Sequence, residues 1–323
     1  MATSSRVRWG ILGTGGINDR FLAHVPKARN ADVVAVGSRT IERAREFAAR
    51  FGIGRAHGTY DALLGDPEVD AVYICLPNSL HHEWTMKAIA AGKHVLCEKP
   101  YSRRAADVSE AFDAADAAGV RLMEAFMWRH NPQVRRFLEL LPEIGELRAI
   151  RSTFAFDLDR PTDVRLRADL DGGSLMDVGC YCVSGARLLV GAEPVRVHGE
   201  QVTGPTGVDV AFAGALRFPG DVLATFVSGF TLRAESLEAI GPRGVLRMPD
   251  PFIGRKPAIW LDDREIPIDP IDPYLLEVEN MSAAIRGEAE PLLGRADALG
   301  QARTIEALYV SAAAGGQPVS LGS

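Results

Sequence analysis

The sequence predicts an α/β protein of two domains. The first domain carries a doubly wound parallel sheet. The second is an α+β domain that carries a large, mainly antiparallel open sheet. Apolar segments alternate with amphipathic segments from Val7 to about Glu124. A glycine-rich turn, "GTGG", follows the first apolar segment. After Leu147, short alternating segments follow one another closely. The first pattern is typical of βαβ units, and the last is typical of a strand meander.

In the first domain, each expected strand is a short apolar run, and the segment after it has helical spacing. The strands are expected in "VRWGIL", "DVVAVGS", "VDAVYICLP", "HVLCE" and "RLMEAF". The helices are expected in "INDRFLAHV", "TIERAREFAARFG", "HHEWTMKAIAAG" and "AADVSEAFDAADAAG". We therefore expect residues 1–128 to form the first domain.

The second domain, residues 129–323, is expected to begin its sheet after the turn "PEIGE". Its first strand is "LRAIRSTFAF", and the glycine-bounded segment "GGSLMDVGCYCVSGARLLVG" is expected to be a helix. Further strands are expected in "VRVHGEQVT", "VDVAFAGALRF", "VLATFVSGF" and "SLEAIG". Helical patterns return in "YLLEVENMSAAIRG" and "RADALGQARTIEALYVSAAAG".

Composition excludes several classes of partner. The 323 residues carry 36 Lys and Arg against 42 Asp and Glu, a formal charge of -6, with no basic run. Nucleic acid and anionic membranes are therefore poor partners. No apolar run approaches the roughly 20 residues of a membrane span, and the start "MATSSRVRWGIL" does not read as a signal peptide, so we expect a cytoplasmic protein.

The four cysteines, Cys75, Cys97, Cys180 and Cys182, have no CxxC spacing. The absence of that spacing argues against both a zinc site and a disulfide framework. We expect reduced, buried thiols and no metal.

Three glycines, Gly13, Gly15 and Gly16, lie between the first strand and the first helix. A dinucleotide site needs glycine there because the chain turns tightly and its backbone must approach a pyrophosphate. Asn18 stands where the motif usually has a third glycine. The pattern predicts a Rossmann domain, and the alternative is an ordinary βα turn.

The end of the second strand indicates which dinucleotide binds. An NAD enzyme usually has an acidic residue there to hold the ribose 2′-hydroxyl, whereas this chain has Ser38 and Arg39, with Arg43 one turn further on. A hydroxyl and two guanidinium groups suit a 2′-phosphate. We therefore expect NADP. The alternative is that the arginines are solvated and that NAD is the cofactor.

The segment "HVLCEKPYS" places Glu98 and Lys99 at the carboxyl end of a short core strand, before Pro100. In an open parallel sheet, ligands bind at that end of the strands. The residues alone allow two interpretations, a catalytic lysine or a salt-linked strand terminus.

Six motifs occur in order along nearly the whole chain: "GTGGIN", "SR", "LPNSLHHEW", "CEKP", "MEAFMWRHNP" and "DGGSLMDVGCY". With them the chain resembles the Gfo/Idh/MocA oxidoreductases. It looks most similar to the branch with glucose-fructose oxidoreductase, dimeric dihydrodiol dehydrogenase and NADP-dependent pyranose dehydrogenases. The resemblance implies a Rossmann domain, an open sheet and a homodimer or homotetramer formed through that sheet.

The resemblance also implies a catalytic set of Lys99, Asp177 and Tyr181, with the Lys99–Pro100 bond cis. Many family members have histidine at the position of Tyr181, so here a phenol would take or give the hydroxyl proton. A nearby Lys99 ammonium would lower the pKa of the phenol from its usual value near 10. Asp177 would bind a neighbouring hydroxyl. The alternative for Tyr181 is core packing.

By resemblance, further residues would contact the cofactor or the substrate. Those expected at the cofactor are Ile17, Leu76, Pro77, Asn78, His81, Glu98, Lys99, Arg129 and Tyr274. Those expected at the substrate are Trp128, Asp157 and Arg165. Packing is the alternative for Trp128, Arg129 and Tyr274.

We thus expect an NADP-dependent oxidoreductase that moves a hydride between nicotinamide and a secondary alcohol or hemiacetal carbon of a pyranose or similar small polyol. A dihydrodiol dehydrogenase or keto-sugar reductase would use the same site. A non-catalytic dinucleotide sensor is the alternative of another class. A sensor has no need for Lys99, Asp177 and Tyr181 together.

Overall fold

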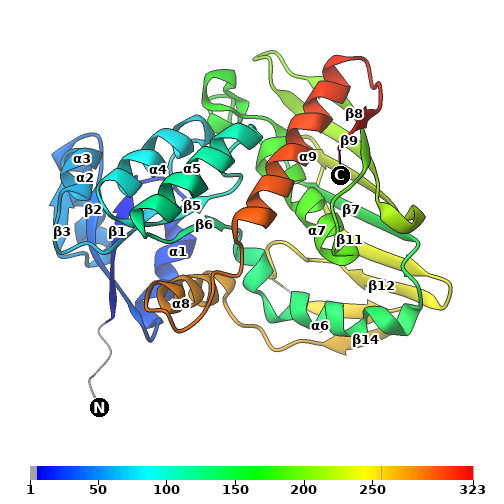
Figure 1. Cartoon of the computed structure of the whole chain (residues 1–323), viewed down its shortest axis with the longest axis horizontal. Helices are drawn as coiled ribbons and strands as arrows, with labels where there is room; N and C mark the ends of the chain where they lie inside the picture. The colour runs from blue at the N-terminus through cyan, green and yellow to red at the C-terminus, as the bar shows by residue number, and fades with distance from the viewer. Residues whose placement is uncertain (1–5, 256, 323) are drawn as a thin grey trace. The chain divides into compact units, whose positions relative to one another are not determined.

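A six-stranded parallel sheet forms the first part of the fold, as the computed structural model shows (Figure 1). The structure describes residues 6–255 and 257–322. The strands are β1 (Val7–Leu12), β2 (Ala31–Gly37), β3 (Arg55–His57), β4 (Ala71–Ile74), β5 (His94–Glu98) and β6 (Leu122–Ala125). Their order, β3-β2-β1-β4-β5-β6, is that of a doubly wound dinucleotide-binding sheet. All strands are parallel, and the order in which successive strands are added to the sheet reverses between β1 and β4.

Helices follow these strands as the alternating pattern predicts. They are α1 (Asn18–His24), α2 (Ile41–Phe51), α3 (Tyr60–Leu64), α4 (His81–Ala90) and α5 (Ala105–Ala118). The ends of α2 show why the sequence folds this way locally. The Thr40 hydroxyl accepts the backbone N–H of Arg43 at its start, and Gly52, with φ 69°, ends it in the left-handed conformation that glycine adopts most easily.

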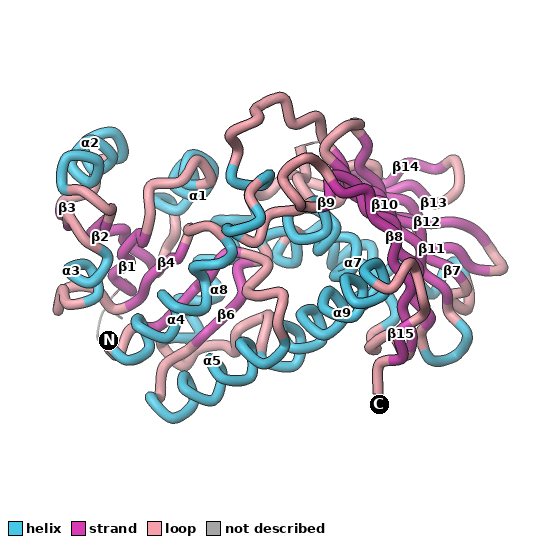
Figure 2. Tube along the Cα trace, turned by 90° about the horizontal axis from the view of Figure 1, so that it is seen from above, coloured by secondary structure: helices cyan, strands magenta, loops and turns pink. Residues whose placement is uncertain are grey.

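A second sheet has nine strands and is mostly antiparallel (Figure 2). They are β7 (Ala149–Ala155), β8 (Arg196–Thr203), β9 (Asp209–Arg217), β10 (Leu223–Gly229), β11 (Ala234–Gly241), β12 (Gly244–Met248), β13 (Ala258–Leu261), β14 (Arg264–Pro267) and β15 (Val319–Ser320). Only β7 and β10 pair in parallel among the pairs described in this sheet. The two sheets confirm the predicted fold class.

Helix α7 (Cys180–Val190) lies against β7, β10 and β11 of the second sheet. Alternation along these strands explains the packing, because Ala224 and Phe226 of β10 are buried while Leu223 and Val227 are exposed. The α-helices α6 (Pro132–Leu140) and most of α9 (Arg295–Ala313) also belong to this part of the chain.

Contacts divide the chain into two compact units that are not contiguous in sequence. The first unit is Met1–Ser102, Ala106–His130 and Asp272–Ala298, and the second is Arg103–Ala105, Asn131–Ile271 and Leu299–Ser323. Helix α8 (Pro273–Ile285) therefore belongs with the parallel sheet. There the fully buried indole N–H of Trp9 donates to the Ser282 hydroxyl over 3.0 Å. The division at residue 128 into two continuous domains stays a prediction.

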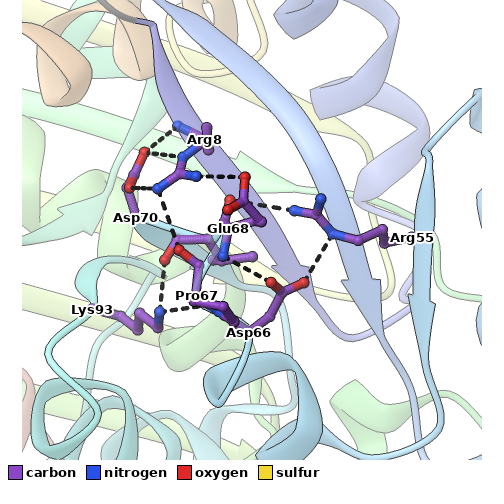
Figure 3. Close-up of polar contacts among 8 residues, drawn as sticks. Arg8, Arg55, Asp66, Pro67, Glu68, Asp70 and Lys93 are labelled. Atoms are coloured by element: carbon purple, nitrogen blue, oxygen red, sulfur yellow. Dashed lines mark hydrogen bonds and ion pairs between the residues drawn. The ribbon is translucent and has the colours of Figure 1, made fainter.

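A polar network joins the amino-terminal edge of the parallel sheet (Figure 3). The Asp70 carboxylate accepts the backbone N–H and the guanidinium of Arg8. Asp66 accepts the Arg55 guanidinium over 2.9 Å, and Lys93 Nζ donates to two backbone carbonyl oxygens at 2.8 and 2.7 Å. Because ligands of such sheets bind at the opposite, carboxyl-terminal edge, we interpret this network as structural.

Two further findings concern the helices and the cysteines. Among the residues that the structure describes, no helix is both long and apolar enough to cross a membrane. All four cysteines are buried, and none of them is in a disulfide within the described residues. The sequence analysis predicted such thiols.

Candidate active site

The glycine turn after β1 is crowded at two positions and open at the third. A Cβ on Gly13, whose φ is 114°, would lie 2.9 Å from the Leu76 side chain. One on Gly15 would lie 3.2 Å from the Cys75 carbonyl oxygen, whereas one on Gly16 would meet no atom of the described part of the chain within 4 Å. Open space beside backbone amides is what a pyrophosphate requires. The residues present therefore fit a dinucleotide.

Asn18 holds this turn in place, a role that the sequence analysis missed. Its side chain is fully buried, and its Nδ2 donates to the carbonyl oxygens of Gly13 at 3.3 Å and Gly15 at 3.0 Å. A third contact, at 3.1 Å, joins Nδ2 to the Cys75 sulfur. At the position where the motif usually has a third glycine, asparagine thus holds the turn through hydrogen bonds.

Ser38 and Arg39 lie next to the glycine turn at the end of β2. The Gly13 N–H donates to the Gly37 carbonyl, and the Ser38 N–H donates to the His57 carbonyl, each over 3.1 Å. Ser38 is 2% exposed, and Arg39 and Arg43 are exposed.

Tyr60, at the start of α3, lies close enough to both arginines for their charges to affect its phenol. Burial is the largest influence and raises the Tyr60 pKa, while Arg39 and Arg43 act to lower it. The Tyr60 ring also packs edge-on against Trp84, with centroids 4.9 Å apart. The sequence analysis did not identify Tyr60, because an aromatic residue in a helical pattern usually indicates core packing.

His81 connects two loops at the carboxyl edge of the sheet. Its side chain is fully buried, with Nε2 2.8 Å from the Leu76 carbonyl oxygen and Nδ1 3.0 Å from the Pro100 carbonyl oxygen. Burial is the main cause of its lowered pKa. Pro77 and the short 3₁₀ helix Asn78–Leu80 come directly before His81. Because His81 contacts Pro100, this loop adjoins the segment that carries Lys99.

Glu98 ends β5, and the Lys99–Pro100 bond is cis, as the resemblance implies. The Tyr73 hydroxyl donates a very short hydrogen bond to Glu98 Oε1, and the Lys99 backbone N–H donates to Glu98 Oε2 over 3.3 Å. The Tyr73 ring stacks on Phe21 with centroids 3.9 Å apart. Glu98 is therefore held from two directions beside the candidate lysine.

A fully buried carboxyl group, that of Glu277, lies close enough to the half-buried Glu98 for its charge to affect the Glu277 pKa. Glu277 of α8 is fully buried, and neither of its carboxylate oxygens has a hydrogen-bond partner among the described residues. Burial first, and then the charges of Glu98 and Asp272, raise its pKa well above the usual value. The raised pKa means that Glu277 holds its proton more strongly than an exposed glutamate does, and its Oε1 lies 4.0 Å from His130 Nδ1.

The other first-unit candidates are largely buried. Arg129 Nη1 donates to Asp297 Oδ2 over 2.9 Å, with the Arg129 side chain 13% exposed. Trp128 is fully buried and packs edge-on against Phe126. Tyr274 packs edge-on against Phe21. Packing is thus the role visible for Trp128 and Tyr274, and their contacts with ligands stay predictions.

In the second unit, Asp177 lies in a π-helical turn, Leu175–Gly179, that precedes α7. The sequence analysis expected one regular helix here. Such turns are frequent at functional sites because they change where a side chain is directed. Asp177 Oδ2 accepts Arg165 Nε over 2.7 Å, so the structure brings these two predicted residues together. Asp157 is exposed on the loop after β7.

A buried carboxylate fixes the start of this turn. Asp209 of β9 accepts the Leu175 N–H at 2.7 Å, the Ser174 hydroxyl at 2.8 Å and the Tyr309 hydroxyl at 2.9 Å. Burial is the largest influence on the Asp209 pKa and raises it, although these hydrogen bonds act to lower it. A Cβ on Gly173 would lie 2.2 Å from Asp209 Oδ1, so glycine is required there.

The Tyr181 ring is enclosed by aromatic side chains. It lies edge-on to Phe154, with centroids 5.2 Å apart, and 5.4 Å from the ring of Phe252. Its exposed fraction is 8%. Lys99 belongs to the first unit, and Asp177 and Tyr181 belong to the second. Among the described residues, no group of three or more His, Cys, Asp or Glu side chains could hold a metal ion.

Family comparison accounts for both parts of the chain. Residues 7–126 match the sequence family described as "Oxidoreductase family, NAD-binding Rossmann fold". Residues 141–247 match the GFO/IDH/MocA C-terminal domain. The chain belongs to the GFO/IDH/MocA oxidoreductase family. This membership confirms the predicted family and the predicted class of enzyme, an NAD(P)-dependent dehydrogenase or reductase.

Individual relatives of this GFO/IDH/MocA chain cover nearly all or about two thirds of its length. A D-xylose 1-dehydrogenase (NADP(+)) from Haloferax volcanii is 38% identical over 95% of this chain and 98% of its own. A trans-1,2-dihydrobenzene-1,2-diol dehydrogenase from Mus musculus is 38% identical over 68% of this chain and 67% of its own. A crystal structure of an aldose-aldose oxidoreductase from Caulobacter crescentus superposes with a TM-score of 0.90 at 30% identity, covering 98% of this chain and 100% of the other.

Proposed function

We propose that the chain is an NADP-dependent dehydrogenase that transfers a hydride between nicotinamide and a hemiacetal or secondary alcohol carbon of a pyranose sugar. The observation that carries this proposal is the near full-length similarity to an NADP-dependent D-xylose dehydrogenase. A 3-ketoreductase from Actinomadura kijaniata, whose crystal structure holds NADP, also superposes with a TM-score of 0.90 at 30% identity, over 95% of this chain and 98% of the other.

NADP would be held at the carboxyl ends of β1 and β2. Gly13, Gly15 and Gly16 would take the pyrophosphate on backbone amides, while Ser38 and Arg39 would contact the 2′-phosphate. The exposed guanidinium of Arg39 next to the Ser38 position supports this assignment. When bound, the nicotinamide supplies the hydride chemistry itself.

The chain's own residues would handle the proton and the orientation of the sugar. In oxidation, the phenolate oxygen of Tyr181 would take the hydroxyl proton as the O–H and C–H bonds break and a C=O bond forms, and the bound nicotinamide would supply the hydride acceptor. Lys99 would orient that hydroxyl and lower the pKa of the phenol, because a nearby cation favours the phenolate. Asp177 would accept a hydrogen bond from a neighbouring sugar hydroxyl.

Two further substrate classes fit the same residues. The similarity to dihydrodiol dehydrogenases supports a cyclic diol. The similarity to dTDP-3,4-didehydro-2,6-dideoxy-alpha-D-glucose 3-reductase from Streptomyces violaceoruber, 37% identical over 80% of this chain and 78% of its own, supports a keto sugar. We place pyranose oxidation first because the D-xylose dehydrogenase matches more of both chains.

We also propose that the protein is a homodimer or homotetramer formed through the second sheet. The outer face of this sheet exposes apolar side chains, namely Val202 at 61%, Leu223 at 53% and Val227 at 40%. Exposed apolar side chains on one face of a sheet support contact with another copy of the chain. Light scattering at several concentrations would measure the oligomeric state, and a monomer at micromolar concentration would contradict the proposal.

The experiment that tests the function is a substrate panel. Aldoses, polyols, dihydrodiols and keto sugars are assayed with NADP(H) and NAD(H) by the absorbance of the reduced nicotinamide. We expect the highest kcat/KM with an aldopyranose and NADP. Tight NADP binding without turnover of any compound would instead indicate a non-catalytic sensor.

A further inference from the structure

We propose that Glu235 is a positioning residue that holds the loop carrying Phe252 and thereby fixes the Phe252 ring against the ring of Tyr181. This inference rests on the proposed function, because it assigns the residue a role through the candidate catalytic phenol. All of the residues involved belong to the second unit. The loop follows β12 and contains Asp250, Phe252 and Gly254.

Glu235 binds the loop through its backbone. One carboxylate oxygen, Oε1, accepts the N–H of Phe252 over 2.7 Å and the N–H of Ile253 over 3.0 Å. The loop is closed on its other side by Asp250 Oδ1, which accepts the Gly254 N–H over 3.2 Å. Gly254 has φ 67°, a conformation that glycine adopts most easily. Two successive amides on one oxygen therefore determine where the Phe252 side chain begins.

Phe252 transmits this placement to Tyr181. Phe252 is 1% exposed, and its ring lies 5.4 Å from the Tyr181 ring and 5.3 Å from the Phe154 ring, measured between centroids. Phe154 contacts Tyr181 in turn at 5.2 Å. Three mutually packed rings leave the phenol few orientations, so a displaced Phe252 would release one side of Tyr181.

We call the two hydrogen bonds from the Phe252 and Ile253 N–H groups to Glu235 the Glu235 clasp. The ionisable groups around Glu235 make this clasp sensitive to pH. Burial first, and then the charge of Asp250, raise the pKa of Glu235 to about 7, and a side-chain hydrogen bond with Asp250 acts in the same direction, while the Phe252 and Ile253 amides act to lower it. From α7, the Cys182 thiol is close enough for the Glu235 charge to affect it and is neutral, since burial raises its pKa to about 12. From β7, the residue opposite Glu235 is Phe154, which carries no charge.

The sign of the pH effect follows from these shifts. In the closed loop, Glu235 keeps its proton up to about pH 7, whereas in an open, hydrated loop it would lose it near the usual value of about 4.3. The opening equilibrium constant should therefore rise with pH, by up to about tenfold per unit between pH 5 and 7, and level off above pH 7.

Hydrogen exchange of the 249–254 segment tests the clasp without any substrate. Exchange rates, corrected for intrinsic chemistry, are measured from pH 5.5 to 8.5. We expect opening to rise with pH in the unmodified protein and to be flat in Glu235→Gln, which keeps an acceptor oxygen but cannot ionise. Glu235→Ala should open faster at every pH.

Glu238→Gln is the matched control. Glu238 lies three residues further along β11, pairs across the strands with Arg151 and Arg247, and points to the opposite face because strand side chains alternate. The Glu238→Gln substitution removes the same charge and should leave the pH dependence of loop opening intact. A flat profile in the unmodified protein, or an unaltered profile in Glu235→Gln, would overturn the clasp.

The link to Tyr181 is tested by kinetics with the best sugar. Glu235→Ala should lower kcat by about tenfold, equivalent to one ordinary hydrogen-bond contribution, with the KM for NADP unchanged. In a Tyr181→Phe background, the same change should lower kcat much less. An equal loss in both backgrounds would show that Glu235 does not act through the phenol.

Two controls separate the possible failures. If Tyr181→Phe alone keeps full turnover, the proposed mechanism fails, and the link from Glu235 to the phenol fails with it, whatever the exchange data show. If Tyr181→Phe loses turnover but the exchange data contradict the clasp, only the present inference fails. If Glu235→Ala does not fold, Phe252→Leu replaces it, and we expect the same fall in kcat with the two loop amides still protected.

Discussion

Arg165 donates its Nε–H to Asp177 Oδ2 over 2.7 Å, and its Nη1 contacts Asp163 Oδ1 at 3.1 Å. The Asp177 charge is the largest of the influences that raise the pKa of Arg165 above its usual value. The arginine is therefore a permanent cation whose position depends on two carboxylates. Because Asp177 is predicted to bind a sugar hydroxyl, we propose that Arg165 orients the Asp177 carboxylate.

Arg165→Ala should weaken catalysis by removing this orienting cation. We expect kcat/KM for the sugar to fall by about ten- to a hundredfold, the range of a hydrogen bond to a charged group, with the KM for NADP unchanged. Arg167→Ala is the matched control, because Arg167 forms an exposed pair with Asp169 two residues away. Equal losses in both variants would contradict the role.

Arg39→Ala should remove most of the preference for NADP. A guanidinium paired with the 2′-phosphate adds about ten- to a hundredfold in affinity, and the variant loses this without affecting NAD. Arg45→Ala, an exposed arginine on the same helix, should change neither cofactor. Titration of both dinucleotides measures the ratio, and comparable affinities in the unmodified protein would show that the NADP assignment is wrong.

Tyr181→Phe should fold and bind NADP while kcat falls by the roughly 10²–10⁴-fold typical of general acid-base catalysis. Lys99→Met should lose at least as much, because it removes the orienting donor and leaves the phenol pKa high. The double variant should lose far less than the product of the two single losses, since both residues act on one proton. Steady-state kinetics at several pH values decides between this and a purely structural tyrosine.

Glu277→Gln should stabilise the protein increasingly as pH rises. The pKa of Glu277 is raised in the folded state, so the folded protein keeps a proton that the unfolded chain loses above about pH 4.3. Its contribution to stability therefore falls as pH rises, and glutamine removes that fall. Thermal unfolding at pH 5 and pH 9 measures the effect. The melting temperatures should be similar at pH 5, and a lower value for the variant at pH 9 would contradict the raised pKa of Glu277.

Asp66→Asn should destabilise the network in Figure 3. Burial acts to raise the Asp66 pKa, but the Glu68 N–H, His57 and Arg55 together lower it below its usual value. This carboxylate therefore contributes stability above about pH 4, which is lost as pH falls through its folded-state pKa. We expect a loss of about 1–3 kcal/mol at pH 7 that shrinks in acid. Urea unfolding measures it, with the exposed Glu46→Gln as control.

The sequence predicted elements whose identity depends on local pattern. Alternation and glycine placement identified β1, the turn at Gly13 and the Ser38 position, because a βαβ unit encodes its turn and strand ends in neighbouring residues. The positions of Asp177 and Tyr181 in one helical segment were also predictable. The π turn that holds Asp177 was not, since apolar spacing over so few residues does not distinguish it from an α-helix.

Residues whose role depends on long-range contacts escaped the sequence analysis. Glu277 looks like an ordinary polar position in "YLLEVENM", and only the folded structure shows that its carboxyl group is fully buried and influenced by Glu98. Glu235 looks like an exposed strand residue, and only the returning loop provides its partners. Asn18 was noticed as a departure from the glycine pattern, but its bonds to the turn required coordinates.

The membership of α8 in the first unit governs the order in which that unit can be completed during synthesis. The ribosome makes the six parallel strands long before it reaches Ser282, the partner of the buried Trp9 indole. Until Asp272–Ala298 emerges, the nascent sheet lacks the helix that covers Trp9. A fragment that stops at His130 would expose this apolar surface, so the first unit finishes folding only after most of the second has been made.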